Sequence, residues 1–463
     1  MLRLYDTASG ATKALEMRDP GTVTMYVCGP TVYDDPHIGH GRAVLAFDVV
    51  RRYLEFRGVH VEHVSNVTDI DDQIIDRAAR EGRAPEEVAK QYEAAWWSAM
   101  DSLGVLRPTH VPHATAYVAQ MVALIEELVS RGAAYETGDG VYLSVEHVDG
   151  YGLLAHQSLD SLRAGARVEV VEEKRSPLDF VLWKKAKPGE PTWDSPWGPG
   201  RPGWHTECVV MSLELLGDGF DLHGGGLDLA FPHHENERAQ AVAWGRPFAR
   251  HWVHNGFVMV GAEKMSKSLG NFTTLTDLLT RADGRAYRLL VLRAHYRSPM
   301  DVDATTVSDA TESLGRLDAL ARRFDLDPSL ARVTASEAPS RGVDGDALAT
   351  FVDRMDDDLD TPGALAGIFD LVRRANHAAD AGDLESARTL AVSVAVLAGA
   401  LGLVLAGPGP ALDEETGQLV RARDDARAQR EWARADELRT ELEGRGWVVE
   451  DTADGTRLHR RDR

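Results

Sequence analysis

The stretch TMYVCGPTVYDDPHIGHGR, residues 24–42, joins a strand pattern to a helix pattern through a Gly-Pro turn. The run TVTMYVC (22–28) is apolar and β-branched, as is typical of a buried parallel strand. In GRAVLAFDVVRRYLEFRG (41–58), apolar residues recur at helical spacing, and Gly58 predicts the helix end. VHVEHVS (59–65) predicts the next strand. This βαβ unit predicts a doubly wound parallel α/β fold, with a ligand crevice at the carboxyl ends of the strands.

Changes in composition divide the chain into three predicted domains. A helical pattern from about 115 leads into short strands and a stretch rich in Trp, Pro and Gly, which indicates an insertion into the α/β fold. From about 305 the sequence is mostly helical, with a Pro/Gly break at 407–410. We therefore predict a Rossmann-like catalytic domain at 1–304 (insertion about 115–203, loop region about 255–304), a helical bundle at 305–406 and a small α+β domain at 407–463.

Charge and cysteine content restrict the class of protein. The 463 residues include only two cysteines, far apart, so we expect no disulfide framework and a cytoplasmic location. The first ten residues lack the apolar core of a secretory signal. A net charge of −22 is unlike a nonspecific nucleic-acid binder. The last eight residues, TRLHRRDR, still carry four arginines, which suit either a solvated tail or a local phosphate contact.

Residues 389–407 form an uncharged run long enough to span a membrane. The run consists mostly of Ala, Val and Gly, a charged helical pattern precedes it, and Pro-Gly-Pro follows it. These flanks favour a buried helix of the bundle over a membrane span. We therefore expect no membrane association.

The turn His37-Ile-Gly-His40 lies where the first helix is predicted to begin. A helix N-terminus offers unpaired N–H groups and a favourable dipole to a phosphate. Gly39 would let the phosphate approach the backbone, and both histidines can donate to its oxygens. The alternative is two surface histidines at a helix start.

The loop KMSKS, residues 264–268, carries Lys264 and Lys267 after a strand-like segment. Fixed cations there would stabilise the charge that develops on the pyrophosphate leaving ATP. Two neighbouring lysines by themselves also suit an ordinary charged loop. The two motifs together, one after the first strand and one after a late strand, are much more specific than either alone.

Four residues form a candidate metal site. Cys28 follows the first strand, Cys208 lies in GWHTECVVM, and His233 and Glu237 lie in PHHENE. Pro232 suits the first turn of a helix, which would place His233 and Glu237 on one face. Two thiolates, an imidazole and a carboxylate make a plausible tetrahedral zinc set. The alternative leaves the histidines as hydrogen-bonded crevice residues and the cysteines as small buried hydrophobes.

Three further features give weaker indications. The acidic run TDIDDQIID (68–76) can be a metal site, but a helix start with Thr68 or Asp69 as N-cap is favoured. Gly224 to Gly226 can lie against adenosine, with Asp228 as a candidate for the ribose or the amino group, or can be a simple turn. Several crevice histidines can form a hydrogen-bonded floor beneath a thiol: His37, His40, His205, His223 and His234.

These motifs, taken together, resemble a known family. HIGH with KMSKS is similar to the class I aminoacyl-tRNA synthetases. The long segments YVCGPTVYDDPHIGHGR, NVTDIDD, GWHTEC, HGGGLDLAFPHHENE and EKMSKSLGN resemble the cysteinyl-tRNA synthetase family within that class. HYRSPMDV, MDDDLDTPGAL and ARADELR extend the resemblance in order to the end of the chain.

The resemblance implies a ligase that activates L-cysteine with ATP and Mg²⁺ and transfers it to tRNA(Cys). It implies a zinc ion on Cys28, Cys208, His233 and Glu237 that binds the substrate thiolate. It also places Thr68 and Trp204 near the bound amino acid and assigns Lys267 to ATP. The bundle and the last domain would bind the tRNA and its anticodon, and the protein would be a monomer.

A cysteine enzyme must reject serine, and a plain pocket discriminates poorly between substrates that differ so little. Zinc prefers a thiolate and deprotonates a coordinating thiol, whereas a hydroxyl is a harder and less acidic ligand. Four protein ligands usually mark a closed site. To admit the substrate, the zinc would have to take a fifth ligand or Glu237 would have to loosen.

The C-terminus departs from the family. Members usually end close to GTRW, whereas this chain reads GTRLHRRDR, with Leu458 in the place of the tryptophan. If that aromatic ring stacks on a tRNA base, the contact is weaker or moved here. Two rival functions stay open: the cysteine ligase of mycothiol synthesis, which charges an amino sugar, and a non-catalytic, zinc-stabilised tRNA-binding protein.

Overall fold

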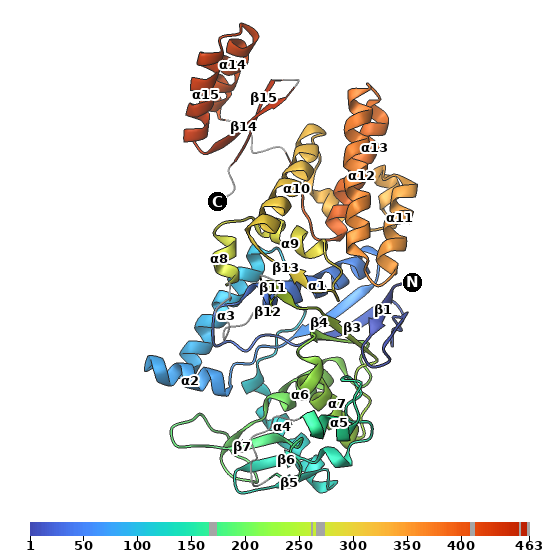
Figure 1. The fold of residues 1–463 in the computed structure, drawn as a ribbon, viewed down its shortest axis with the longest axis vertical. Helices are drawn as coiled ribbons and strands as arrows, with labels where there is room; N and C mark the ends of the chain where they lie inside the picture. Colours follow the sequence, from blue (N-terminus) through green and yellow to red (C-terminus); the bar gives the residue numbers. More distant parts are fainter. Residues whose placement is uncertain (166–173, 261–262, 265–273, 408–412, 453–454, 461–463) are drawn as a thin grey trace.

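The computed structural model describes residues 1–165, 174–260, 263–264, 274–407, 413–452 and 455–460. At its centre is a parallel sheet in the order β10-β9-β3-β4 (Figure 1). Its strands are β3 (Thr22–Val27), β4 (His60–Ser65), β9 (Leu222–Gly226) and β10 (His251–Asn255). Strands from both ends of the catalytic region thus pair directly, which confirms the doubly wound α/β prediction.

Helix α1 (Ile38–Phe56) connects β3 to β4. It begins three residues earlier than the predicted segment, because His37 caps its first turn. At the other end, Gly58 adopts φ +80°, a left-handed conformation that suits glycine after a helix. The predicted βαβ unit is therefore confirmed.

Other elements surround this sheet, and the N-terminal hairpin β1–β2 lies beside β10, where the Thr7 N–H donates to the Trp252 carbonyl. The helices of this part are α2 (Asp72–Glu81), α3 (Pro85–Ser102), α6 (Trp204–Leu216), α7 (Glu235–Trp244), α8 (Leu275–Leu279) and α9 (Gly284–Leu292). The remaining strands are β1 (Arg3–Asp6), β2 (Ala11–Ala14), β11 (Val258–Val260), β12 (Glu263–Lys264) and β13 (Met300–Asp301). The last three form a separate small sheet in the order β12-β11-β13.

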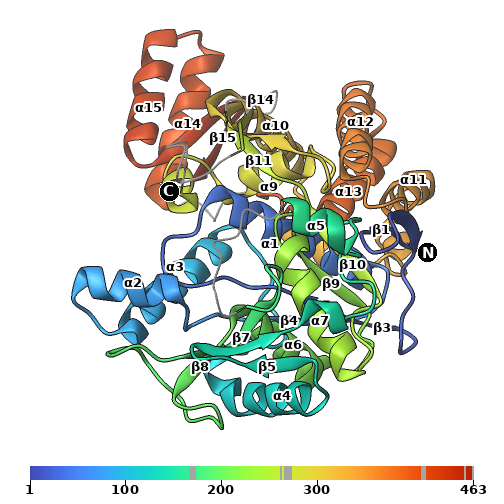
Figure 2. The ribbon, with the colours of Figure 1, turned by 60° about the horizontal axis from the view of Figure 1, so that its bottom comes forward.

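A second sheet lies on the far side of the molecule from the bundle (Figures 1 and 2). It is antiparallel, in the order β5-β6-β7-β8, and α4 (Val118–Ser130) packs with it. Its strands are β5 (Ala134–Glu136), β6 (Gly140–Leu143), β7 (Phe180–Lys185) and β8 (Gly200–Pro202), and α5 (Leu159–Gly165) lies between β6 and β7 in sequence. The inserted segment therefore folds as a compact lobe beside the catalytic sheet.

Four helices follow the catalytic region: α10 (Ala304–Arg323), α11 (Gly345–Asp356), α12 (Thr361–Asp380) and α13 (Leu384–Ala400). The uncharged run at 389–407 forms most of α13, whose residues from Leu390 to Ala400 are buried. Among the described residues, no helix is long and apolar enough to cross a membrane. The apolar character of this run therefore comes from its place at the centre of the bundle.

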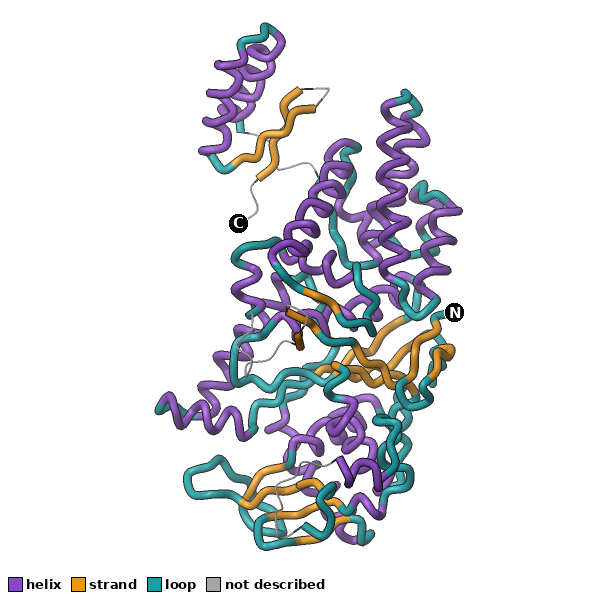
Figure 3. Tube along the Cα trace, viewed as in Figure 1, coloured by secondary structure: helices purple, strands orange, loops and turns teal. Residues whose placement is uncertain are grey.

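The C-terminal segment forms a small unit of its own, at the upper left of Figures 1 and 3. Helices α14 (Glu414–Ala428) and α15 (Trp432–Gly444) pack on the hairpin β14 (Trp447–Thr452) and β15 (Gly455–Arg460). Leu458 is only 9% exposed and packs with Leu442, Trp447 and Val449. Its side chain thus belongs to the core of this unit and is not a stacking surface for a tRNA base.

One apolar core runs from the central sheet through α1 into the helical bundle. At the crossing, Phe351 of α11 lies edge-on to Phe56 and Tyr53 of α1, with ring centroids 5.9 and 6.4 Å away. Aromatic pairs in this arrangement stabilise beyond the area that they bury. The bundle is therefore packed directly on the helix that begins at the HIGH turn.

Candidate active site and metal centre

A cavity of about 430 Å³ lies at the carboxyl ends of the parallel strands, as predicted. The residues after β3, the start of α1 and the ends of β9 and β10 line it. Of the predicted site residues, six line this cavity: Cys28, His37, Gly39, His40, Trp204 and Asp228. Gly225 and Gly226 line it too, whereas a side chain at Gly224 would meet the Phe47 ring at 2.2 Å. Gly224 therefore serves close packing against α1.

His37 and His40 form a reciprocal cap at the start of α1. The backbone N–H of His40 donates to Nδ1 of His37 at 3.2 Å, and the N–H of His37 donates to Nδ1 of His40 at 3.2 Å. Because each Nδ1 is an acceptor, the proton of each neutral ring is on Nε2. The turn thus presents two imidazole N–H donors and a helix N-terminus to the cavity, which suits a phosphate.

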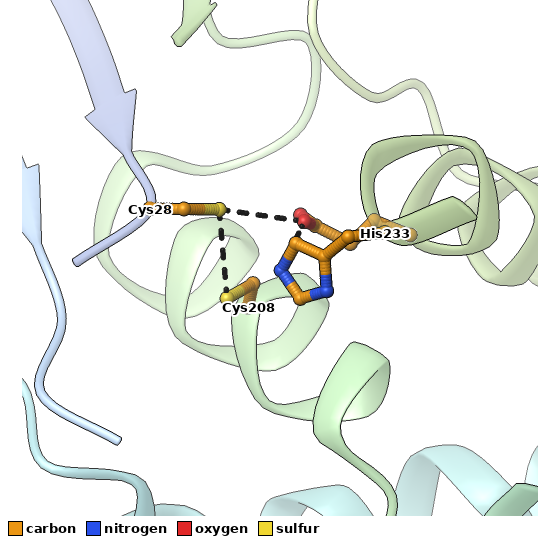
Figure 4. A group of neighbouring side chains, drawn as sticks. Cys28, Cys208 and His233 are labelled. Carbon is orange, nitrogen blue, oxygen red and sulfur yellow. Dashed lines mark hydrogen bonds and ion pairs between the residues drawn. The ribbon is translucent and has the colours of Figure 1, made fainter. Parts of the chain in front are cut away.

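The four predicted metal ligands converge. One donor atom each from Cys28, Cys208, His233 and Glu237 lies within 4.8 Å of all the others. The Cys28 Sγ atom is 3.7 Å from Sγ of Cys208 and 3.5 Å from Oε1 of Glu237 (Figure 4). His233 Nε2 is 3.0 Å from the same Glu237 oxygen. The ligands come from the turn after β3, from α6, and from α7 with the turn before it, so only the folded chain assembles this centre.

Burial and mutual repulsion control the protonation of these ligands. Burial, with Cys208 and Glu237 close by, raises the pKa of the Cys28 thiol well above its usual value. A hydrogen bond from Cys28 lowers the pKa of Cys208, but burial and Glu237 outweigh it and leave that pKa raised. Burial also holds the pKa of His233 well below its usual value, so its imidazole is neutral. A divalent cation would relieve the repulsion among these groups, and the donor set matches zinc.

A second group of histidines supports the centre. His223 Nε2 lies 2.7 Å from the other Glu237 oxygen, and His205 Nδ1 lies 2.8 Å from His233 Nδ1. His234 Nδ1 lies 2.8 Å from Nε2 of His254, and Nδ1 of His254 lies 2.7 Å from the Thr7 hydroxyl. Of the five histidines predicted to form a floor, His205 and His223 contact metal ligands and His234 contacts His254, whereas His37 and His40 pair with each other. The floor beneath a thiol stays a prediction. Cys28, His223, His234 and Glu237 also converge within 4.8 Å, an alternative donor set.

Sequence reasoning missed Asn66 and Glu207, which hold the Thr68 hydroxyl close to the Cys28 turn. The Asn66 Oδ1 atom accepts from the Tyr26 hydroxyl at 3.1 Å and from the Gly29 N–H at 2.9 Å, and its amide donates to the Thr68 hydroxyl at 3.2 Å. Thr68 in turn donates to Glu207 at 2.8 Å. Burial raises the pKa of Glu207 well above its usual value. Asn66 therefore links the Cys28 turn to Thr68. In the sequence, its position directly after a strand, in NVTDIDD, could have indicated a residue of the site.

The acidic run at 68–76 does not begin a helix at the predicted residue. Asp71 is the N-cap of α2 and accepts from the Gln73 N–H, whereas Thr68 is fully buried. Asp69 instead accepts from the backbone and hydroxyl of Thr115 at 3.0 and 2.6 Å. Thr68 and Asp69 therefore make tertiary hydrogen bonds instead of capping the helix as the local pattern had predicted.

Pro232 lies in the helical turn Ala230–His234, which runs directly into α7 at Glu235. Phe231, before the cis Phe231–Pro232 bond, is non-helical, so Pro232 lies in the first turn of the helical backbone, as predicted. His233 and Glu237 still meet across one turn, as the predicted spacing required.

Trp204 and the signature loop complete the predicted set. Trp204 is 38% exposed and stacks on the His233 ring with centroids 4.0 Å apart. Lys264 ends β12, which pairs with β11 next to the cavity. Lys267 lies outside the described residues.

Comparison with known proteins agrees with this geometry. A family model for the class I (C) tRNA synthetase catalytic domain matches residues 14–312. The solved complex of Mycobacterium tuberculosis methionyl-tRNA synthetase with methionyl-adenylate has a similar fold, with a TM-score of 0.62 at 16% identity, over 89% of this chain and 96% of that one. The fold and the two signature elements define a class I aminoacyl-tRNA synthetase.

Relatives identify the family within that class. A DALR domain model matches 350–406, and a model of the cysteinyl-tRNA ligase anticodon-binding domain matches 409–459. A cysteine–tRNA ligase of Chromobacterium violaceum is 46% identical over 470 residues, 98% of this chain and 99% of the relative. One of Geobacter sulfurreducens is 44% identical over 481 residues, 98% of each. The chain belongs to the cysteine–tRNA ligase family.

Proposed function

We propose that this chain joins L-cysteine to the 3′ end of tRNA(Cys) in two steps, using zinc to select the substrate thiolate. The cysteine carboxylate attacks the α-phosphorus of ATP, which forms cysteinyl-adenylate, and pyrophosphate leaves with the electron pair of the broken P–O bond. A hydroxyl of the terminal tRNA ribose then attacks the cysteinyl carbonyl and loses its proton, and AMP leaves. The observation that carries the proposal is the thiol, imidazole and carboxylate cluster beside the phosphate-binding turn.

His37, Gly39 and His40 are the proposed contacts of the α-phosphate. Both rings carry donors, and the helix N-terminus adds backbone N–H groups at the same point. Lys264 and Lys267 are assigned to the leaving pyrophosphate, where added positive charge lowers the barrier most. Mg²⁺ accompanies ATP and neutralises part of its charge.

The glycine-rich edge of the cavity is the proposed adenosine site. Gly225 and Gly226 line it at the end of β9, and their lack of side chains lets a ring lie against the backbone. Asp228, which lines the same wall, can accept from a ribose hydroxyl or from an amino group. Gly224 shapes this edge by admitting the Phe47 ring beneath it.

Cys28, Cys208, His233 and Glu237 would hold the zinc ion. When bound, zinc supplies a soft Lewis acid that favours the thiolate of cysteine over the hydroxyl of serine. His223 holds Oε2 of Glu237, and His205 lies against Nδ1 of His233, so each of these two ligands has a partner outside the cluster. Such partners of a ligand fix its orientation and affect metal affinity.

Thr68 and Trp204 are the proposed contacts of the rest of the amino acid. The Thr68 hydroxyl is held by Asn66 and Glu207, so its direction is fixed before the substrate arrives. Trp204 stacks on His233 and lines the cavity, where it can shield the thiol from water.

We propose this division of labour among the predicted domains: catalysis at 1–304, tRNA binding at 305–406 and anticodon binding at 407–463. The family matches at 350–406 and 409–459 support a tRNA acceptor over the amino sugar of the mycothiol ligase. We further propose a monomer that works in the cytoplasm, where both thiols stay reduced for the metal.

Charging of purified tRNA(Cys) by metal-analysed protein tests this function, with the amino-sugar acceptor and labelled serine run in parallel. Cysteine on tRNA with serine excluded is the expected result. Cysteine transferred only to the amino sugar would show that tRNA is not the acceptor. If zinc-loaded protein catalysed no ATP–pyrophosphate exchange, the chain would be a non-catalytic tRNA-binding protein.

A further inference from the structure

Asp358 is a buried junction between the helical bundle and the catalytic domain. It lies between α11 and α12, in the motif MDDDLDTPGAL, and has φ +55° with a side chain 7% exposed. Its Oδ1 atom accepts from the backbone N–H of Tyr5 at 2.8 Å and from the Tyr296 hydroxyl at 2.7 Å. The left-handed backbone is one that Asp and Asn tolerate better than most residues.

The other oxygen of Asp358 holds Arg297. Arg297 Nε donates to Oδ2 at 2.8 Å, its terminal NH₂ group donates to the same oxygen, and its guanidinium lies 4.5 Å from the centre of the Tyr5 ring. Neighbouring Asp358 raises the pKa of Arg297 against the opposing effect of burial. The ion pair therefore fixes the segment 295–298. This segment belongs to the motif HYRSPMDV, to which the proposed function assigns no role.

The backbone of this segment contacts both signature elements. The Tyr296 carbonyl accepts from the Gly256 N–H at 2.8 Å, just before β11. Arg42 of α1, two residues after His40, donates to the carbonyls of Tyr296 (3.3 Å) and Ser298, and to that of Phe257 at 2.5 Å. Arg42 is fully buried, so these carbonyls are the partners that compensate its charge.

The backbone approach at this point is close. A side chain at Gly256 would meet the carbonyl oxygens of Arg297 at 2.5 Å and Ser298 at 2.6 Å. Directly after it, the Met300 N–H donates to the Phe257 carbonyl at 3.0 Å, and β13 continues in parallel with β11. A shift of the segment would therefore move α1 and the β11–β12 pair relative to each other.

We propose that Asp358 and Arg297 are positioning residues. Through them the bundle sets where the HIGH turn lies relative to the strand pair β11–β12, which carries Lys264. The inference rests on the proposed function, because it needs both elements to act on one ATP. In-line transfer requires the α-phosphate contacts and the pyrophosphate contacts to be aligned together, and a misplacement of about 1 Å can cost up to ~10²-fold in rate. Among the contacts described above, none involves Cys28, Cys208, His233 or Glu237.

The test is ATP–pyrophosphate exchange by full-length, zinc-loaded protein carrying Asp358→Asn, Arg297→Ala, both changes, or Arg297→Lys. Asn keeps the left-handed backbone and the acceptor for Tyr5, but it removes the charge and turns an amide donor toward Arg297. Asp380→Asn, which alters an exposed ion pair of α12, is the matched control. Zinc content and the unfolding midpoint are measured for each variant.

We expect Asp358→Asn and Arg297→Ala each to lower kcat about tenfold and to leave the KM for cysteine within about twofold, because the lost alignment stabilises only the transition state. The double variant should be no worse than the poorer single one, because the two residues act as one unit. Arg297→Lys keeps the charge and should recover part of the rate, so the series still decides if Asp358→Asn does not fold. The proposal would be overturned if a folded variant kept its kcat. It would also be overturned if a variant lost zinc in the same proportion as activity, because the loss of activity would then follow from the loss of metal. No exchange by the parent protein would instead count against the proposed function.

Discussion

His37 and His40 stack with ring centroids 3.6 Å apart, and each accepts the backbone N–H of the other on Nδ1. One pair of side chains therefore both starts α1 and sets the tautomer of the phosphate donors. A capping interaction of this kind contributes ~1 kcal/mol to stability. Catalysis and local folding can be separated here, because they use different nitrogens of the ring.

The variants His40→Asn and His40→Gln separate these roles. Asn places its oxygen where Nδ1 lies and keeps the cap, but it has no group at Nε2. Gln reaches the Nε2 position with its amide. We expect Asn to lower adenylate formation about 10²- to 10³-fold, as loss of a transition-state donor does, and Gln to lower it less. Exchange kinetics and thermal unfolding check this, and a larger loss for Gln than for Asn would contradict the Nε2 assignment.

Cys208→Ser should remove stoichiometric zinc and most cysteine activation. The hydroxyl is a poor ligand at a site whose affinity depends on thiolates. Ser212→Ala, one turn further along α6, removes a buried hydroxyl that bonds only the Val209 carbonyl among the described residues and serves as the control. Metal analysis and exchange at several cysteine concentrations provide the measurements. Full activity in metal-free Cys208→Ser protein would exclude a zinc role in selection.

Leu458→Ala should unfold the small C-terminal unit and spare the catalytic domain. Leu458 pairs with Val449 across the hairpin in a core of few residues, and a buried Leu→Ala change costs about 2–5 kcal/mol. The KM for tRNA should therefore rise while exchange stays unchanged. Glu437→Ala, at an exposed site on α15, is the control. If ATP–pyrophosphate exchange falls by the same factor as tRNA charging, the assignment of this unit to tRNA binding alone is wrong.

The sequence predicted the parts of the fold and site that local pattern encodes. The strand–helix–strand unit follows from periodicity and turn residues, and the four ligands follow from residue types that seldom occur together. Asn66, Glu207 and Asp358 were not predicted, because their roles depend on partners far away in the chain. The same cause explains the wrong caps: hydrogen bonds of Thr68 to Glu207 and of Asp69 to Thr115 outweighed the local preference.

His63 should make stability fall as the solution is acidified. Burial, and to a lesser extent Arg51, lowers its pKa to about 3, and neither ring nitrogen has a hydrogen-bond partner within the described part of the chain. The unfolded chain takes up a proton below about pH 6.5 that the folded protein does not, so stability is lost as pH falls from 6.5 toward 3. Between pH 7.5 and pH 5 this single group accounts for about 2 kcal/mol.

His63→Phe keeps an aromatic ring on β4 and removes the titration, so the free energy of unfolding should depend less on pH by that amount. His60→Phe changes a histidine three residues earlier on the same strand, where the side chain is 66% exposed, and serves as the control. Denaturant unfolding at pH 7.5 and pH 5 gives the comparison. Other buried histidines titrate in the same direction, so the difference between variants, and not the total slope, measures His63. Equal slopes for the parent and His63→Phe would mean that the His63 ring is protonated in the folded protein and is hydrated through the cavity that it lines.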